Sequence, residues 1–346
     1  MNMIEDILTV VLLAAGLINF VLEAKRDLMM LQQNSYRNER YMRWLRASGD
    51  TTSVVRLLCY AALLIMLMPR IPVVFRCVVA LIPLLINIFK LLVAKYKKPL
   101  VWTKRARRIY GTACALCVIV IGASWLVCHE LFSVGCAVVA VYALSHVLML
   151  FSNLLLRPVE AHINKGFYND AERILKSMPD LKVVGITGSY GKTSTKHYLN
   201  RILSEKYNVL MTPGSYNTLM GVIRTVREMM QPYTEVFICE MGAKNIGDIK
   251  EICDLVHPSV GVVTAVGEQH LESFKTIGNV QRTKFELVDA LPSSGVAFVN
   301  NDFPYVASRK VDNVECCRYA VGNNDEAVYR VTSMTFSEDG TDFTLT

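Results

Sequence analysis

The segment that most constrains the fold spans residues 183–194 and reads Val-Val-Gly-Ile-Thr-Gly-Ser-Tyr-Gly-Lys-Thr-Ser. Its β-branched start, 183–187, predicts a buried strand, and residues 195–206 carry apolar side chains at helical spacing. Glycines punctuate the turn between them, and a Lys-Thr pair begins the helix. A strand, a glycine turn and a helix in this order are typical of a phosphate-binding loop. The alternative is a tight turn with an incidental lysine.

Each residue type in this turn has a physical role in holding a nucleotide. Gly188 and Gly191 let the backbone wrap a phosphate so that successive N–H groups point toward it. Lys192 is placed to reach the β- and γ-phosphates, and the Thr193 hydroxyl is placed to ligate Mg²⁺. Ile186 stands where the strict motif has glycine. The predicted nucleotide-binding residues of the loop are Gly188, Ser189, Gly191, Lys192, Thr193 and Ser194.

Composition divides the chain into two unlike halves. Hydrophobic residues make up 52% of the sequence and the mean hydropathy is +0.32, which places part of the chain in a membrane. Residues 1–156 contain 17 Lys and Arg against 7 Asp and Glu, whereas residues 157–346 contain 20 against 23. This distribution predicts a membrane region followed by a soluble domain, and it gives no indication of nucleic-acid binding.

Five apolar runs in the first half are candidates for membrane spans, although the first two are shorter than the ~20 residues that a spanning helix needs. The runs cover approximately residues 7–22, 54–68, 71–94, 109–127 and 131–151. Basic residues gather in the links 23–53 and 95–108, whereas the other two links carry Arg70 or no cation. Because basic loops stay in the cytoplasm, we predict about five spans, an outside N-terminus and a cytoplasmic second half in the cytoplasmic membrane.

Few charged residues lie inside the apolar runs. Three of them are close enough to run ends to extend toward the membrane surface. They are Arg56, Arg76 and Lys90. In the first basic link, Arg37, Arg40 and Arg43 recur at helical spacing beside tyrosines and a tryptophan. This pattern favours an interfacial helix that contacts anionic lipid, and the sharper alternative is a pocket for a phosphorylated lipid or a nucleotide-sugar.

The second half alternates short β-branched runs with helical segments, which predicts an α/β fold with a mostly parallel sheet covered on both faces. A linker helix is expected within 157–180, followed by a nucleotide-binding domain over 181–346. Strands are predicted at 183–187, 208–211, 235–239, 260–266 and 296–299. Helices are predicted between them at 221–230, 246–254 and 281–291.

Polar side chains follow three of these strands. They are Glu240, His270 and Asn300. Ligands of such sheets gather beyond the carboxyl ends of the strands, and a carboxylate beside a phosphate loop is a natural Mg²⁺ ligand. A lone histidine is more often a capping or packing group. The combination of these residues after a phosphate loop therefore indicates a metal and nucleotide site, which none of them indicates alone.

Three motifs together resemble the central ATPase domain of the Mur ligases. They are Thr-Gly-Ser-Tyr-Gly-Lys-Thr-Ser at 187–194, Glu-Met-Gly-Ala at 240–243 and Gly-Glu-Gln-His-Leu-Glu at 267–272. The last two spellings are most similar to the branch that joins D-alanyl-D-alanine to UDP-N-acetylmuramoyl-tripeptide. The resemblance runs from about Leu181 to the end of the sequence, which is roughly half of it.

The resemblance implies ATP and Mg²⁺ as cofactors. It implies that Lys192 and Thr193 bind ATP and magnesium, and that Glu240 and His270 hold magnesium. Lys284 stands where the family has a carbamylated lysine near the metals, and an ordinary surface lysine is the alternative.

Two asparagines complete the implied site. Asn217 matches an asparagine near the transferred phosphate, and Asn300 matches one that contacts the adenine. The catalytic residues implied by the resemblance are Lys192, Asn217, His270 and Lys284. The sequence departs from the family at Thr218, where asparagine is common, and at Ala265, where an asparagine often precedes the histidine motif.

Two whole domains of the family have no counterpart in this sequence. The membrane region occupies the place of the soluble domain that holds the UDP-sugar, and the C-terminal ligase domain is absent. We therefore expect a fragment of a longer protein that is inactive by itself.

The implied reaction is ATP-dependent amide formation in peptidoglycan precursor synthesis. ATP phosphorylates a peptide carboxylate, and the amine of D-alanyl-D-alanine or of an amino acid attacks the acyl phosphate. Membrane lipid is a further expected partner. The alternatives are a ligase for a lipid-linked or folate-like acceptor, and a nucleotide-binding scaffold without activity. A transporter or sensor is a third alternative, for which no Leu-Ser-Gly-Gly-Gln coupling motif is present.

Overall fold

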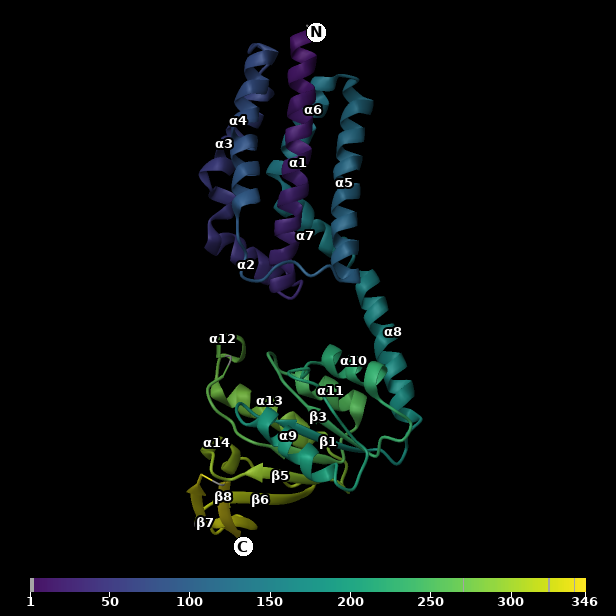
Figure 1. The fold of residues 1–346 in the computed structure, drawn as a ribbon, viewed down its shortest axis with the longest axis vertical. Coiled ribbons are helices and arrows are strands. Elements are labelled where there is room, and N and C mark those ends of the chain that lie inside the picture. The colour runs from purple at the N-terminus through teal and green to yellow at the C-terminus, as the bar shows by residue number, and fades with distance from the viewer. Residues whose placement is uncertain (1–2, 270, 323, 339) are drawn as a thin grey trace. The chain divides into compact units, whose positions relative to one another are not determined.

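The computed structural model describes residues 3–269, 271–322, 324–338 and 340–346. The chain forms two compact units, Met1–His162 and Ile163–Thr346. The boundary lies within helix α8 (Arg157–Lys176), and the predicted start of the linker at 157 is where this helix begins (Figure 1). Each unit is described by itself below.

The N-terminal unit is helical (Figure 1). In chain order it contains α1 (Met3–Gln33), α2 (Asn38–Ser48), the 3-10 helix η1 (Asp50–Thr52), α3 (Val54–Met66), α4 (Val73–Val93), α5 (Lys104–Cys128), α6 (Leu131–Ala143) and α7 (Ser145–Leu155). Three of these helices, α1, α4 and α5, are long and apolar enough to span a membrane. Helices α6 and α7 form a fourth stretch of span length, which is bent by 73°.

The number of crossings, predicted as about five, stays a prediction, because helix length alone does not count them. All five apolar runs are helical, but α3 has only 13 residues. At 1.5 Å per residue it covers about 20 Å, against the ~30 Å of a hydrocarbon core. The described residues therefore contain three spans of full length, or four when the bent pair is counted.

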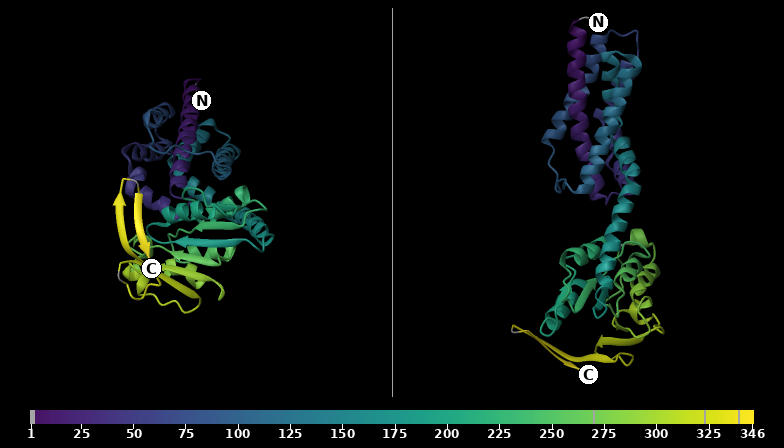
Figure 2. Two further views of the ribbon diagram at one scale, coloured as in Figure 1. Left: turned by 60° about the horizontal axis from the view of Figure 1, so that its bottom comes forward. Right: turned by 90° about the vertical axis from the view of Figure 1, so that its right-hand side faces the viewer.

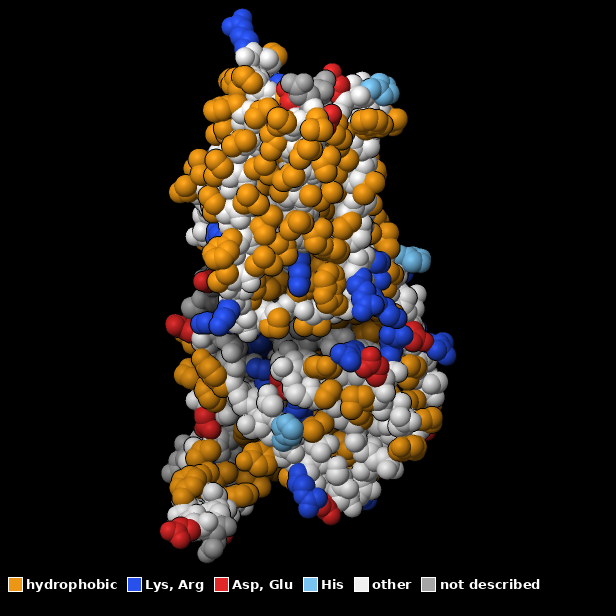
Figure 3. Space-filling model, turned by 45° about the horizontal axis from the view of Figure 1, so that its top comes forward, with side chains coloured by type: hydrophobic (Ala, Val, Ile, Leu, Met, Phe, Trp, Pro, Cys, Tyr) orange, Lys and Arg blue, Asp and Glu red, His pale blue; other side chains and the backbone are white. Residues whose placement is uncertain are grey.

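Apolar side chains cover the outside of this unit. Phe89 is 72% exposed, Leu126 is 71% exposed and Val127 is 79% exposed. Figure 3 shows a broad hydrophobic surface over these helices. A surface of this size is unfavourable in water and favourable in lipid, so we interpret the unit as a membrane region.

Arg56 does not extend toward the membrane surface as predicted from its position in the sequence. Its side chain is 3% exposed and its Nη2 lies 3.0 Å from Glu23 Oε1 on α1. Its Nη1 donates hydrogen bonds to the carbonyl oxygens of Tyr142 and Ala143, at 3.3 and 3.0 Å. These carbonyls lie where α6 ends before the bend. Arg56 thus satisfies backbone groups that the broken helix leaves without partners.

The C-terminal unit contains an eight-stranded sheet in the order β2-β3-β1-β4-β5-β6-β7-β8. The strands are β1 (Lys182–Thr187), β2 (Val209–Met211), β3 (Val236–Glu240), β4 (Val260–Val263), β5 (Val296–Asn300), β6 (Glu315–Val321), β7 (Tyr329–Ser337) and β8 (Gly340–Leu345). All neighbours are parallel except β7 and β8. The five predicted strands are confirmed, whereas β6, β7 and β8 were not predicted. Figure 2 shows the β7–β8 hairpin extending from the end of the sheet.

Helices cover both faces of the first five strands. They are α9 (Lys192–Leu203), α10 (Leu219–Met229), α11 (Asp248–Val256), α12 (Leu271–Phe274), α13 (Ile277–Asp289) and α14 (Pro304–Ala307). Val183 and Phe237 pack on the face with α10, α11 and α13, while Ile186 and Ile238 pack on the face with α9. This alternation follows from the two-residue period of a strand, and it leaves the carboxyl ends of the strands free for ligands.

Candidate nucleotide and metal site

The turn after β1 is held by the segment that follows β4. The Ser189 N–H donates to the carbonyl of Ala265 at 2.7 Å, and the Thr264 hydroxyl donates to the carbonyl of Tyr190 at 2.5 Å. A Cβ on Gly188 would lie 2.1 Å from the Thr264 hydroxyl oxygen, so only glycine fits there. Gly191 has φ +80° and begins α9, a left-handed conformation that glycine adopts without strain.

Lys192 lies over this turn. Its Nζ donates to the carbonyl of Gly188 at 2.6 Å and to that of Ser189 at 3.3 Å. Burial lowers the pKa of Lys192, and the nearby charge of Glu240 acts in the opposite direction. A phosphate offers stronger acceptors than these two carbonyls, so the ammonium group is placed to exchange them for phosphate oxygens.

Glu240 ends β3 directly beside β1, because the register pairs it with Ile186. Its side chain is buried, and it accepts hydrogen bonds from the Thr193 hydroxyl at 3.2 and 3.3 Å and from Asn217 Nδ2 at 3.0 Å. Burial alone raises the pKa of Glu240, but hydrogen bonds from Lys196, Asn217 and Thr193 outweigh it, so the pKa lies below its usual value. The carboxylate is therefore charged and positioned beside the first turn of α9.

Lys196 is a member of this group that the sequence analysis missed. Its side chain is 0% exposed, and its Nζ lies 2.9 Å from Glu240 Oε2. The sequence contained one indication of this arrangement. Lys196 follows Lys192 by four residues, so the two side chains lie on neighbouring turns of one helix face.

Lys284 is not a surface lysine. It lies on α13 with 2% of its surface exposed. Among the described residues, no acidic side chain forms an ion pair with Lys284. Burial lowers the pKa of Lys284 to about 8, and the charge of Lys192 adds to this effect. A larger fraction of neutral amine is what carbamylation requires, because the neutral form reacts with CO₂. The environment of Lys284 thus fits the modification that the resemblance implies.

The other predicted site residues are spread along the same edge of the sheet. Asn300 ends β5, two strands from β1, and its Oδ1 accepts the N–H of Asp302 at 3.1 Å. Ser194 lies exposed in the first turn of α9. His270 lies outside the described residues. The structure therefore brings Lys192, Thr193, Asn217 and Glu240 together, and it places Asn300 farther along.

Comparison with known families identifies the domain that carries this geometry. Residues 186–346 match the family model of the Mur ligase middle domain. The C-terminal half of the chain carries a Mur ligase middle domain. The match begins inside β1 and includes every predicted site residue.

Curated relatives agree with this assignment over the same part of the chain. The UDP-N-acetylmuramoyl-tripeptide–D-alanyl-D-alanine ligase of Bacillus subtilis is 31% identical over 167 residues, which cover 47% of this chain and 35% of that protein. The enzyme of the same name from Escherichia coli is 33% identical over 173 residues, which cover 47% of this chain and 36% of that protein. The chain thus spans about a third of the length of these relatives.

A solved structure also aligns with the chain. The crystal structure of MurF ligase from Thermotoga maritima in complex with ADP covers 52% of this chain and 41% of that chain, with 27% identity and a TM-score of 0.48.

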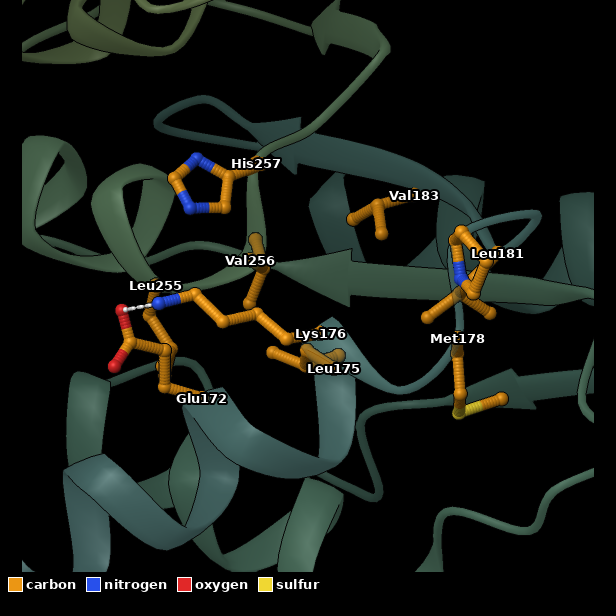
Figure 4. Close-up of a pocket in the computed structure, with 10 residues that line it drawn as sticks. Glu172, Leu175, Lys176, Met178, Leu181, Val183, Leu255, Val256 and His257 are labelled. Atoms are coloured by element: carbon orange, nitrogen blue, oxygen red, sulfur yellow. Dashed lines mark hydrogen bonds and ion pairs between the residues drawn. The ribbon is translucent and has the colours of Figure 1, made fainter.

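The Mur ligase middle domain also has a small hollow away from the phosphate loop (Figure 4). Its volume is about 220 Å³, and it is lined by the end of α8, the start of β1 and the end of α11. Glu172 and Lys176 form an ion pair of 2.9 Å across one side of it, and Val183 lies at the opposite side. Because β1 begins here and the phosphate loop follows its other end, this hollow is separate from the nucleotide site.

Proposed function

We propose that this protein is an ATP-dependent amide ligase of peptidoglycan precursor synthesis. In this proposal it joins D-alanyl-D-alanine to an acceptor like UDP-N-acetylmuramoyl-tripeptide, as the names of its relatives suggest. The observation that carries the proposal is the position of Glu240, which accepts hydrogen bonds from both Thr193 and Asn217 beside the phosphate loop. This arrangement gathers a phosphate-binding turn, a hydroxyl and a charged carboxylate at one point.

The phosphate loop supplies binding and orientation of ATP. Backbone N–H groups of the glycine turn and the N-terminus of α9 face the phosphates. Lys192 leaves the carbonyls of Gly188 and Ser189 and pairs with the β- and γ-phosphates, where it offsets the negative charge that develops as the phosphoryl group moves. Thr193, Glu240 and His270 are the residues that would hold Mg²⁺, which supplies further neutralisation of the transferred phosphoryl group.

Asn217 and Lys284 act on the acceptor side in this proposal. Asn217 donates to Glu240 and lies in the loop after β2, where it can orient the carboxylate that receives the phosphoryl group. The neutral amine of Lys284 adds to CO₂, which forms an N–C bond and releases a proton. The resulting carbamate places a negative charge on a long side chain inside a buried part of the site.

A coupled assay on the native protein, extracted from its source membranes, tests the function. We expect ADP release only when ATP, a peptide-carboxylate acceptor and D-alanyl-D-alanine are all present. Dependence on a folate-like or a lipid-linked acceptor in place of the UDP-linked one would assign another ligase reaction. ADP release at the same rate without the acceptor and without the amine would contradict the ligase proposal.

We also propose that the middle domain lies in the cytoplasm and that the membrane region tethers it beside the membrane steps of wall synthesis. Exposed Lys95, Lys97 and Lys98 lie in the link between α4 and α5, and basic links remain on the cytoplasmic side.

Cysteine labelling of intact cells tests this orientation. Ser308→Cys places a thiol at an exposed position of the middle domain, and Cys128→Ser in the same variant removes the exposed native thiol at the end of α5. We expect no reaction with a membrane-impermeant reagent until the cells are lysed. Labelling before lysis would show that the domain faces outward.

A further inference from the structure

Lys196 joins two parts of the nucleotide site that approach α9 from different strands. Its Nζ donates to the carbonyl of Gly214 at 2.6 Å and lies 2.9 Å from Glu240 Oε2. Gly214 belongs to the loop between β2 and α10, and Glu240 ends β3. We propose that Lys196 is a positioning residue that fixes the Glu240 carboxylate and the loop 212–218 relative to each other, and thereby sets the affinity of the site for Mg²⁺ with nucleotide. This inference rests on the proposed ATP-binding function.

Lys196 and Lys192 differ in how deeply their side chains are buried, and this difference gives them different roles. Lys196 is 0% exposed, so its ammonium group cannot reach a phosphate at the surface of the loop. Lys192 is only partly buried and its Nζ lies over the turn. Two lysines one turn apart on α9 therefore have different tasks. Lys192 is placed to touch the ligand, whereas Lys196 acts through Glu240 and Gly214.

The loop 212–218 is attached to the end of β3 on both sides of Gly214. Before it, the Thr212 hydroxyl accepts the backbone N–H of Glu240 at 3.1 Å. After it, the carbonyl of Asn217 accepts the N–H of Gly242 at 2.7 Å. Gly214 itself has φ +50°, and Lys196 holds its carbonyl between these two attachments. Without the lysine, the middle of the loop loses its hydrogen bond to α9, and only the attachments before and after Gly214 remain.

Lys196 also orients the Glu240 carboxylate, because its Nζ lies 2.9 Å from Oε2. Lys196 contacts Oε2, Asn217 contacts Oε1, and the Thr193 hydroxyl donates to both oxygens. Each carboxylate oxygen has two lone pairs, so Lys196 and Asn217 fix the plane of the carboxylate and leave to a metal the capacity that the Thr193 hydroxyl uses. Partners that orient a ligating group in this way commonly change metal affinity when removed.

The test measures binding of a non-hydrolysable ATP analogue to the full chain in detergent, with EDTA and across a Mg²⁺ titration. We expect Lys196→Met to leave the affinity in EDTA within about twofold of wild type and to raise the Mg²⁺ concentration at half-saturation by about tenfold, the size typical of lost support for a metal ligand. Lys250→Met is the matched control, because it removes an ion pair of 2.7 Å with Asp254 on the exposed surface of α11. This control should behave as wild type.

Three results would overturn the inference. Unchanged Mg²⁺ dependence in Lys196→Met would show that the lysine does not position Glu240. An equal loss of affinity in EDTA and in Mg²⁺ would show a general effect on the fold. Tighter Mg²⁺ binding in Lys196→Met would show that the positive charge of Lys196 repels the metal and does not support its ligand. Wild-type protein that fails to bind the analogue at all would instead contradict the proposed function.

A second measurement needs no nucleotide, and it tests the inference even if Lys196→Met alone does not fold. Lys196→Met combined with Glu240→Gln removes both charges, so no unpaired charge stays buried. We compare amide hydrogen exchange of residues 214–218 in this double variant and in Glu240→Gln alone. Faster exchange in the double variant is expected if Lys196 holds the loop through Gly214. Equal exchange would show that the loop is ordered without it.

Discussion

The two units of the molecule each bury a group of charged side chains, but they balance these charges in different ways. In the membrane unit, Arg26 lies 2.8 Å from Glu23 and 2.6 Å from Asp50, and Arg56 also pairs with Glu23. The ring of His146 lies between two acids, 2.8 Å from Asp27 and 3.0 Å from Asp50. In the middle domain, Lys196 is paired with Glu240, while Lys192 and Lys284 have no acidic partner among the described ion pairs.

The difference reflects where the compensating charge comes from. The acidic side chains of the cluster in the membrane unit are buried away from water and counter-ions, so each charge there must find its partner within the protein. Glu23, Asp50 and His146 are close enough together to hold a metal ion. The two arginines already satisfy the carboxylates of this group, so the cluster is complete as a set of ion pairs. The nucleotide site, by contrast, keeps unmatched cations because the proposed ligand brings negative charge with it.

Breaking the closed cluster should have the largest effect. Glu23→Gln leaves Arg56 buried without its ionic partner, and we expect a loss of about 3–5 kcal/mol in the unfolding free energy of the membrane unit. Combining it with Arg56→Met removes both charges and should recover most of this loss. Detergent unfolding of the full chain, followed by tryptophan fluorescence, measures the effect because all three tryptophans lie in this unit.

The exposed pair between Arg224 and Glu228 provides the control, and because it lies in the middle domain, which contains no tryptophan, circular dichroism follows its unfolding. Its atoms are 2.7 Å apart, but both side chains are more than half exposed. Glu228→Gln should change stability by less than about 1 kcal/mol. A Glu23→Gln protein as stable as this control would mean that the membrane cluster is not a closed set of ion pairs.

Removing an unmatched cation should affect binding and leave stability nearly unchanged. Lys192→Ala loses the ammonium group that the proposed phosphates would meet, and we expect at least about a hundredfold weaker ATP binding, as for loss of one partner of a buried charge pair. Calorimetric titration measures the affinity and thermal unfolding measures the stability. Wild-type affinity in this variant would contradict the phosphate-loop interpretation.

The smallest expected effect is a pH dependence at Lys284. Because its pKa is lowered to about 8, the neutral amine increases as pH rises through this value, and carbamate formation at a fixed CO₂ concentration should increase with it. Protein equilibrated with ¹³C-bicarbonate should show a carbamate carbon signal that grows from pH 7 to pH 9. Lys284→Met should lack this signal. A signal that persists in the variant would assign the carbamate to another amine.

Much of the fold and part of the site could be predicted from the sequence because they depend on neighbouring residues. The short β-branched runs predicted the first five strands, and the helical spacing after Thr193 predicted α9. Gly188 and Gly191 indicated the turn because few other residues adopt its conformation. The strands β6, β7 and β8 were missed because they lack the buried β-branched pattern that marked the others. β6 is mostly half-buried, and β7 and β8 are mostly exposed.

The sequence by itself thus determined the apolar helices, the phosphate loop and the acidic strand end, since local periodicity and residue chemistry encode each of them. Only the tertiary structure decided which charges meet. Arg56 was expected at the membrane surface but pairs with Glu23. The spacing of Lys196 from Lys192 indicated a shared helix face, but it did not indicate the contact with Glu240. The bend between α6 and α7 and the burial of Lys284 were decided in the same way. The physical reason is that ion pairing and burial depend on distances between elements far apart in the chain, and packing alone sets those distances.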